Sequence, residues 1–493
     1  GTYLLYDGAC GTGGMLTVAE ETLNELAAEH NKQVSTHLFG QEINGETYAI
    51  AKADLLLKGE GEEADNIIGG PEWSTLSNDA FPSKEFDFML SNPPYGKSWK
   101  SDQERMGGKA GMRDPRFVIE HAGDAEYSLV TRSSDGQLLF LANMLSKMKH
   151  NTPLGSRIAS VHNGSSLFTG DAGSGESNTR RWIIENDWLE AIIALPLNMF
   201  YNTGIATYVW VLSNRKPDRR RGQVQLIDAT QWFEPRRKNL GKKNCDLSDG
   251  NIQSILDAFL DFEPTEQSRI FDNAEFGYWK VTVERPLRLS IDLSEARCDQ
   301  FREACLLVDE IPIANVVDRV AQAIGDGPHS DFNIFRGRIE ADAAHNGVKL
   351  TAKRVKLLQT ALAERDDTAE RVIRRIYKPG KAEADPIRGL FEATVGGKSV
   401  VLEYETDTDL RDTETVPFKE PGGVEAFIRR EVLPHAPDAW LDEAKTTVGY
   451  EISFTRYFYK PQPMRQLDAI RADIVALERE TGGLMADIIG VAR

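Results

Sequence analysis

The sequence predicts an α/β protein with a mainly parallel sheet in its first part, followed by a mostly helical region. Residues 1 to about 215 alternate strand-like and helix-like segments, which is typical of parallel strands joined by helices. The first strand-like segment, 3–6, runs directly into a glycine-rich turn and then into a helical pattern. From about residue 246 the pattern is mostly helical and acidic, so we place the end of the sheet domain at residue 245.

The elements of this sheet follow from local periodicity. We expect strands at 3–6, 34–39, 86–90, 157–161, 189–194 and 206–212. We expect helices at 17–30, 47–58, 136–149 and from 180 onward. The strand at 206–212 and the residues before it predict an antiparallel pair at the end of the sheet. The polar, glycine-rich stretches 95–135 and 165–179 predict long loops.

The rest of the chain divides into a mostly helical α+β region, 246–460, and a last helix within 461–493. Inside the first we expect a long charged helix at 352–377 and a strand at 400–404. Apolar residues of the last helix recur with heptad spacing at Leu467, Ile470, Ile474, Leu477, Leu484 and Ile488, with Thr481 as the polar exception. Such a seam indicates either a helix that binds a partner or an amphipathic helix lying on its own domain.

The amino-acid composition indicates the cellular compartment in which the protein is expected. No apolar run reaches the length of a membrane span and no signal segment opens the chain, so we expect a cytoplasmic protein without membrane contact. The four cysteines form no C-x-x-C pair, which argues against a zinc site, another metal centre or a disulfide framework. Because the first residue is Gly1 and not methionine, we expect an N-terminal portion to precede this sequence.

The charge of the chain limits how it could bind nucleic acid. The net charge of −18 argues against a protein that holds nucleic acid over its whole surface, but it permits a local basic patch or a basic partner. Residues 215–243 contain ten Lys or Arg residues against three acidic ones. This stretch is either a solvated linker face or a phosphate-contacting edge of a DNA channel.

The first motif is "DGACGTGGML", residues 7–16, between the first strand and the first helix. Its glycines let the backbone approach a ligand at a helix N-terminus. A dinucleotide motif counted from Gly11 would need glycine at the position of Leu16, so a pyrophosphate ligand is not favoured. Asp7 at the mouth of the loop suits a ligand with a charged amine. The candidate ligand-binding residues are Asp7, Gly11, Thr12, Gly13 and Gly14.

The second motif, "LFGQEIN", places Glu42 at the carboxyl end of the second strand. Ligands of open α/β sheets bind at that edge, and a carboxylate there can accept two ribose hydroxyls. Asp7, the glycines and Glu42 together describe a nucleoside with an amino-acid-like tail, such as S-adenosylmethionine. The alternative is an ordinary surface glutamate.

The third motif, "SNPPY", residues 91–95, ends the strand at 86–90. The side-chain oxygen of Asn92 and the carbonyl of Pro93 can hold the two hydrogens of a planar amine and so free its lone pair. Pro93 and Pro94 make the loop rigid, which preorganises these acceptors. Tyr95 offers a flat face for a base taken out of a duplex. The alternative is a rigid turn without a ligand.

These motifs, read as "DGACGTGGML", "GQEIN" and "FDFMLSNPPYGKSW" in this order and spacing, resemble those of adenine-N6 DNA methyltransferases. More narrowly, they resemble the modification (M) subunit of type I restriction–modification systems. The later segments "LEAIIALPLNMFYNTGIATYVWVLSN" (189–214) and "PMRQLDAIRADIVALERETGGLM" (463–485) agree with that subunit. The resemblance implies a Rossmann-like, S-adenosylmethionine-dependent methyltransferase domain over 1–245 and a partner-binding final helix.

The resemblance also implies roles for individual residues. Asp7, Gly11 and Gly13 would hold the methionine end of the cofactor, and Glu42 its ribose. The loop 92–95 would be catalytic, and Phe200 would line the pocket for the target base. The partners would be double-stranded DNA, a specificity (S) subunit, a second M subunit and a restriction (R) subunit. We expect residues 96–135 to be a mobile loop that becomes ordered on DNA.

Two departures from the family pattern leave alternatives open. Gly8 stands where the family usually has proline, and we expect it to loosen the turn. Ser74 stands where an acidic residue often contacts the cofactor's adenine, a role that Asp79 could take instead. The competing functions are a protein glutamine N5-methyltransferase, which uses the same loop chemistry, and a catalytically weak assembly subunit.

Overall fold

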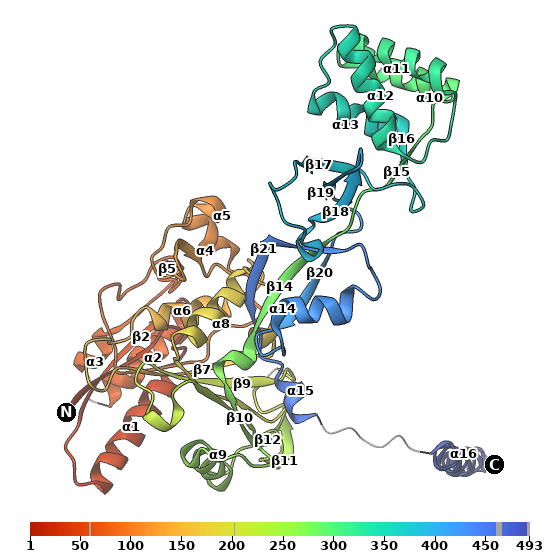
Figure 1. Cartoon of the computed structure of the whole chain (residues 1–493). Helices are drawn as coiled ribbons and strands as arrows, with labels where there is room; N and C mark the ends of the chain where they lie inside the picture. Colours follow the sequence, from red (N-terminus) through yellow and green to blue (C-terminus); the bar gives the residue numbers. More distant parts are fainter. Residues whose placement is uncertain (59–60, 202, 460–465, 491–493) are drawn as a thin grey trace. The chain divides into compact units, whose positions relative to one another are not determined.

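The computed structural model describes residues 1–58, 61–201, 203–459 and 466–490 (Figure 1). The chain forms two compact units, Gly1–Ile452 and Ser453–Arg493, and each is described by itself.

A nine-stranded sheet forms the centre of the first unit, in the order β13-β10-β8-β9-β7-β4-β1-β2-β3. Its strands are β1 (Thr2–Asp7), β2 (Ser35–Glu42), β3 (Ile67–Gly69), β4 (Phe88–Ser91), β7 (Arg157–Asn163), β8 (Leu189–Ala194), β9 (Thr207–Ser213), β10 (Gln223–Asp228) and β13 (Ser268–Asp272). β9 runs antiparallel to β7 and β8, and β13 antiparallel to β10. The predicted antiparallel strand is therefore confirmed, but it lies inside the sheet, because β10 and β13 extend the sheet beyond it.

The helices that join these strands confirm the α/β prediction (Figure 1). They include α1 (Gly14–Glu29), α2 (Gly45–Leu57), α6 (Gln137–Leu145) and α8 (Gly175–Glu185). The predicted start of a helix at residue 180 is wrong, because α8 begins five positions earlier. The Ser174 side chain accepts a hydrogen bond from the backbone N–H of Ser177 and caps the helix, so the polar sequence before it is a helix start as well as a loop.

The segment 96–135 is not the long unstructured loop that we expected. It contains α4 (Lys100–Arg105), α5 (Gly108–Gly111) and the hairpin of β5 (Val118–His121) and β6 (Asp124–Ser128). Buried side chains within it, among them Trp99, Phe117 and Leu129, pack against Leu139 of α6. This small core holds the insertion together. The expected loop at 165–179 is likewise short, because α7 (Ser165–Phe168) and the start of α8 occupy most of it.

Beyond β10, the hairpin of β11 (Glu234–Leu240) and β12 (Lys243–Asp246), helix α9 (Asp249–Asp261) and β13 complete the sheet domain. A three-stranded sheet follows, in which β14 (Gly277–Glu284) lies between β20 (Asp412–Pro417) and β21 (Trp440–Tyr450). Helices α10 (Glu295–Leu307), α11 (Ile311–Ile324), α12 (Phe332–His345) and α13 (Ala352–Leu362) pack around a separate apolar core. A second small sheet contains β17 (Ile373–Tyr377), β18 (Phe391–Val395) and β19 (Lys398–Tyr404).

In this region the strand expected at 400–404 is confirmed as part of β19, whereas the long helix expected at 352–377 is wrong. That helix ends at Leu362, and β16 (Ala363–Arg365) follows at once. The carboxylate of Asp366 then accepts hydrogen bonds from the backbone N–H and the hydroxyl of Thr368. Such a local turn competes with helix continuation.

The second unit contains α15 (Phe454–Phe458) and the predicted last helix, α16 (Leu467–Gly490). Four apolar residues of its heptad pattern, Leu467, Ile470, Ile474 and Leu477, are exposed. The side chains of Thr481, Leu484 and Ile488 lie outside the described residues, as do residues 460–465 next to the expected domain boundary. Of the helices that the structure describes, none is both long enough and apolar enough to cross a membrane.

Candidate active site

The strand order brings the three sequence motifs to one edge of the sheet. β1 pairs in parallel with β2 on one side and with β4 on the other, in the registers Asp7 opposite Gly40 and Tyr6 opposite Met89. The glycine loop, Glu42 and the loop that starts at Asn92 therefore all follow carboxyl ends of adjacent strands. This is the edge at which open α/β sheets bind ligands.

Asp7 is the buried anion of this edge. One of its carboxylate oxygens accepts hydrogen bonds from the Ala9 backbone at 2.9 Å and from the Ser91 hydroxyl at 2.8 Å. Burial raises the pKa of Asp7 to about 7; the two hydrogen bonds oppose this shift and the charge of Glu42 adds to it. Ser91 is a site residue that we had not singled out, although it stands directly before Asn92 in the motif.

The glycine loop depends on backbone conformations that favour glycine. Gly11 and Gly13 have φ values of +55° and +81°, in the left-handed region. A Cβ built on Gly11 would meet no atom within 4 Å, so the backbone is open to a ligand there. Glu42 Oε2 accepts the Gly11 N–H at 2.9 Å, and its other oxygen accepts the Asn44 N–H at 2.8 Å. Thr12 and Gly14 are exposed.

Gly8 is required by packing. A Cβ on this residue would lie 2.8 Å from the Tyr6 hydroxyl and 3.1 Å from Thr75 Cγ2. The Tyr6 hydroxyl is fixed because it accepts a hydrogen bond from Asn143 Nδ2 at 3.0 Å, and the Thr75 hydroxyl donates to the Gly8 carbonyl. A larger residue would collide with these groups, so the turn at Gly8 is closely packed.

Asp79 is engaged in a buried ion pair. Its carboxylate accepts from Lys147 Nζ at 2.6 Å and lies 3.8 Å from Arg116. These partners disfavour the idea that Asp79 contacts a cofactor in place of Ser74, which is itself buried.

The loop after β4 presents its amide to the outside. Asn92 and Pro94 are exposed, Pro93 is buried, and Tyr95 is half-buried, which raises the pKa of its hydroxyl. Just after the loop, the Gly96 N–H donates to Asp135 Oδ1 at 3.2 Å. The loop is thus fastened at both ends, and the exposed Asn92 is accessible to a ligand.

Phe200 lies farther along the same edge. It follows β8, which is separated from β4 by β9 and β7. Its ring packs against the apolar cluster that contains Ile193, Leu195 and Ile227. A role for Phe200 in a base pocket stays a prediction.

Comparison with known proteins decides the family. A family model described as N-6 DNA Methylase matches residues 2–283, more than half of the chain. The chain belongs to the N-6 DNA methylase family. The match covers the whole nine-stranded sheet, which is therefore the Rossmann-like methyltransferase sheet that the resemblance implied.

Curated relatives of this methylase are type I restriction enzyme methylase subunits. The MjaIX subunit of Methanocaldococcus jannaschii is 27% identical over 279 residues, which are 57% of this chain and 44% of that protein. The MpnII subunit of Mycoplasma pneumoniae is 28% identical over 52% of this chain and 42% of its own length. The matched region thus spans less than half of these relatives. They confirm the resemblance to type I modification subunits.

A solved structure is also similar. It is a type I restriction–modification system methyltransferase subunit from Streptococcus thermophilus, with 26% sequence identity and a TM-score of 0.43. The similarity covers 55% of this chain and 51% of that one.

The basic stretch 215–243 of the methylase serves two purposes. Lys216 forms a buried ion pair with Asp187 at 2.6 Å, and Arg220 donates to the Phe259 carbonyl near the end of α9. These cations hold the fold together. Others, such as Arg221 before β10 and Arg237 and Lys238 on β11, are exposed, so these cations can offer charge to a partner.

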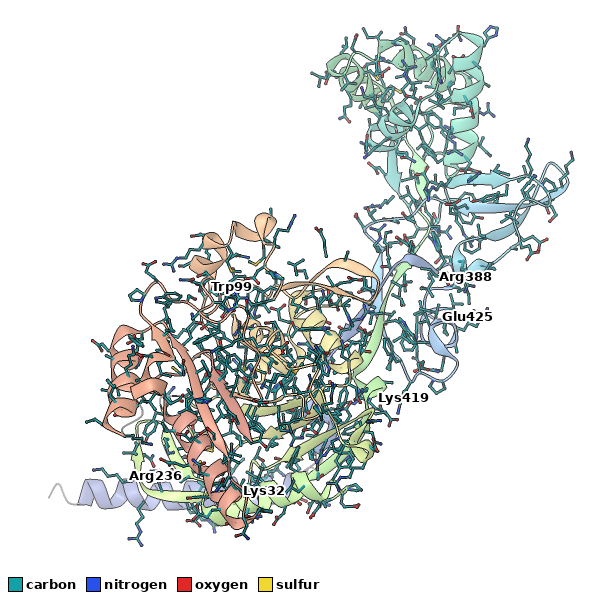
Figure 2. The ribbon with its side chains drawn as sticks, turned by 90° about the vertical axis from the view of Figure 1, so that its left-hand side faces the viewer. Lys32, Trp99, Arg236, Arg388, Lys419 and Glu425 are labelled. Atoms are coloured by element: carbon teal, nitrogen blue, oxygen red, sulfur yellow. The ribbon has the colours of Figure 1, made fainter. Side chains whose placement is uncertain are left out.

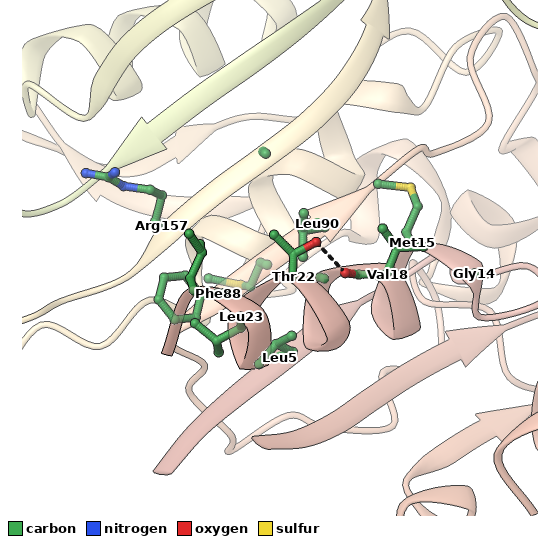
Figure 3. Close-up of a pocket in the computed structure, with 13 residues that line it drawn as sticks. Leu5, Gly14, Met15, Val18, Thr22, Leu23, Phe88, Leu90 and Arg157 are labelled. Carbon is green, nitrogen blue, oxygen red and sulfur yellow. Dashed lines mark hydrogen bonds between the residues drawn. The ribbon is translucent and has the colours of Figure 1, made fainter. Parts of the chain in front are cut away.

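An apolar pocket of about 580 Å³ lies on the face of the sheet beside α1 and reaches the site edge at Gly14 (Figure 3). Val18 and Leu23 of α1 face Leu5 of β1 and Phe88 and Leu90 of β4 across it. Apolar walls do not suit a charged nucleoside, so we do not assign the cofactor to this pocket.

Proposed function

We propose that this chain transfers a methyl group from S-adenosylmethionine to adenine N6 in double-stranded DNA, as the modification subunit of a type I restriction–modification complex. The observation that carries the proposal is the meeting of three groups at one sheet edge: the buried Asp7, the glycine loop held by Glu42, and the exposed Asn92. Membership of the N-6 DNA methylase family supports DNA as the substrate over a protein glutamine.

The cofactor-binding residues fit a charged nucleoside. Asp7 in its ionised form attracts an ammonium group, and the open backbone at Gly11 lets a ligand approach. Each oxygen of Glu42 accepts one backbone N–H, so each keeps a lone pair for a ribose hydroxyl. When bound, S-adenosylmethionine supplies an activated methyl group. Thr12, Gly13 and Gly14 complete the loop around it.

The catalytic loop acts through position and hydrogen bonding. The Asn92 side-chain oxygen and the Pro93 carbonyl accept the two N–H hydrogens of the amine, which directs its lone pair toward the methyl donor. Pro93 and Pro94 restrict the loop, so little order is lost at the moment of reaction. Tyr95 stacks on the extruded base. The methylated nitrogen loses its proton afterwards, so no general base is needed.

Assembly would occur through α16, whose exposed apolar residues offer a seam to the specificity subunit. In such a complex the specificity subunit reads the DNA sequence, a second modification subunit completes the clamp, and the restriction subunit joins them. A net charge of −18 is compatible with this division, because the partner supplies much of the DNA contact.

The deciding experiment is Asn92→Ala in the chain co-expressed with its specificity subunit. We expect N6-methyladenine formation to fall by at least roughly a hundredfold, because Asn92 contacts only the reacting amine. Cofactor affinity, measured by calorimetry, should stay within about twofold of the parent protein, because Asn92 lies outside the cofactor loop. Asn346→Ala, which changes an exposed amide after α12, should leave both quantities unchanged.

Full methylation by the Asn92→Ala protein would refute the mechanism. A parent protein that binds no S-adenosylmethionine would instead support the assembly-only alternative.

A further inference from the structure

A cavity of about 700 Å³ with a mixed polar and apolar lining lies in the insertion that follows the catalytic loop. Its walls come from 103–133 of the insertion and from 173–176, where α8 begins. A volume of this size holds a nucleotide-sized group. None of these residues belongs to the motifs described above.

The cavity and the catalytic loop are both attached to the segment 132–135. Trp99, four residues after Tyr95, donates from its backbone to the Ser133 carbonyl at 3.0 Å. Its indole donates to the Arg132 carbonyl at 2.9 Å. A group held in the cavity is therefore in fixed register with the loop that would receive the base. Figure 2 labels Trp99 within this part of the molecule.

The walls of the cavity are closely packed and joined by hydrogen bonds. The Arg132 N–H donates to Glu176 Oε1 at 3.0 Å, and Asn178 Nδ2 donates to the Ser128 carbonyl at 2.8 Å. A Cβ on Gly175 would lie 2.0 Å from the Val130 carbonyl oxygen, so glycine is needed for α8 to begin this close to the insertion. The cavity is thus a preformed feature of the fold.

Three exposed cations line the cavity: Lys109, Arg113 and Arg132. In the described part of the chain, neither Lys109 nor Arg113 forms an ion pair, and Arg132 approaches only Asp135, at 3.9 Å. Two carboxylates, Glu126 and Glu176, also line the cavity. The three cations outnumber them by one, so the lining carries a net positive charge in a protein whose net charge is −18.

We infer that this cavity binds backbone phosphate of the DNA beside the target adenine and so fixes the strand while the base leaves the duplex. The inference rests on the proposed function. Guanidinium and ammonium groups are the usual phosphate ligands. Because the cavity is tied to the catalytic loop through Trp99, a phosphate held there sets the distance from the strand to Asn92.

The test uses the full chain, co-expressed with the specificity subunit, and a fluorescent DNA duplex. In the triple variant Lys109→Gln, Arg113→Gln, Arg132→Gln, each lost phosphate contact should reduce the slope of log affinity against log salt by about 1. We expect a reduction of about 1 to 3 in that slope, a loss of affinity of roughly tenfold or more at moderate salt, and unchanged cofactor binding.

A control triple variant removes the same charge elsewhere: Lys32→Gln, Lys349→Gln and Lys356→Gln, all exposed. Lys32 is labelled apart from Trp99 in Figure 2. The control should keep the parent's salt slope and affinity within about twofold.

The possible negative results distinguish a failure of this inference from a failure of the proposed function. An unchanged slope in the cavity variant, with DNA methylation still dependent on Asn92, would overturn the inference and leave the proposed function standing. Lost co-purification of the specificity subunit with an unchanged slope would assign the cavity to a protein partner and also overturn it. A parent complex that neither binds nor methylates DNA would refute the proposed function itself.

Discussion

The hydroxyl of Ser91 donates a hydrogen bond to the carboxylate of Asp7 at 2.8 Å. This contact ties the strand that ends in the Asn92 loop to the strand that ends in the glycine loop. The two halves of the proposed reaction, methyl donor and acceptor amine, thus meet across one buried carboxylate. Its protonation state should affect both stability and binding.

The substitution Asp7→Asn tests how the protonation state of Asp7 affects stability and cofactor binding. The folded pKa of about 7 exceeds the ordinary value of 3.8, so the folded protein holds the proton more tightly than the unfolded chain does. This stabilises the fold at low pH, and the stabilisation is lost as pH rises from about 4 through 7. Asparagine stays neutral, so above pH 7 we expect the variant to have a higher free energy of unfolding by roughly 1–3 kcal/mol.

The measurement is urea unfolding of both proteins between about pH 5 and pH 8.5. The difference in stability should grow with pH and level off above the pKa of Asp7. Cofactor affinity should fall in the variant, and in the parent protein it should rise with pH, because only the ionised carboxylate attracts an ammonium. A stability difference independent of pH would contradict this assignment.

Gly8→Ala tests the packing at the start of the glycine loop. The new methyl group would press on the Tyr6 hydroxyl, and we expect a loss of about 1–3 kcal/mol in urea unfolding. Gly14→Ala is the matched control, since its Cβ would meet nothing within 4 Å, and it should cost no stability. Adding Tyr6→Phe should recover part of the loss from Gly8→Ala; strictly additive effects would count against the collision.

Arg180→Met tests the junction between α8 and β21. The buried guanidinium donates to the carbonyls of Ser166, Thr169 and Tyr450, and burial lowers its pKa to about 10. Methionine leaves these carbonyls without a donor, so we expect a loss of about 3 kcal/mol or more. Arg221→Met removes an exposed surface ion pair and should cost under about 1 kcal/mol. Similar losses from both would refute a special role for Arg180.

Deletion of residues 464–493 tests the partner helix. We expect the specificity subunit no longer to co-purify, because the apolar seam of α16 is removed. Ile474→Glu, within the seam, should have the same effect without shortening the chain. Ala472→Glu, on the opposite side of the heptad pattern, should leave co-purification intact. Unchanged co-purification after the deletion would rule out this assignment.

Local patterns were enough to predict much of the fold and the placement of the motifs. From β1 through the glycine loop to α1, the spacing of apolar residues changes from a strand-like to a helical period. This strand, loop and helix could therefore be predicted from neighbouring residues alone. The Ser91–Asp7 contact could not, because it depends on β4 lying beside β1 rather than beside β2 or β3.

The insertion 96–135 escaped prediction for a related reason. Its core joins Trp99, Phe117 and Leu129, which are far apart in a polar sequence, so no window of residues shows a period. The role of Gly8 was also hidden, because Thr75 and Asn143, which fix its surroundings, are distant in the sequence.

The apolar pocket beside α1 has a consequence for how the isolated chain behaves in solution. Exposed Val18 and Leu26 on its rim favour association between molecules, while a net charge of −18 keeps them apart. Salt weakens the repulsion, because the Debye length falls to about 8 Å at physiological ionic strength, but it does not weaken the apolar attraction. Colloidal stability of the purified chain should therefore decrease as salt is added, and buffers of low ionic strength should keep it monodisperse.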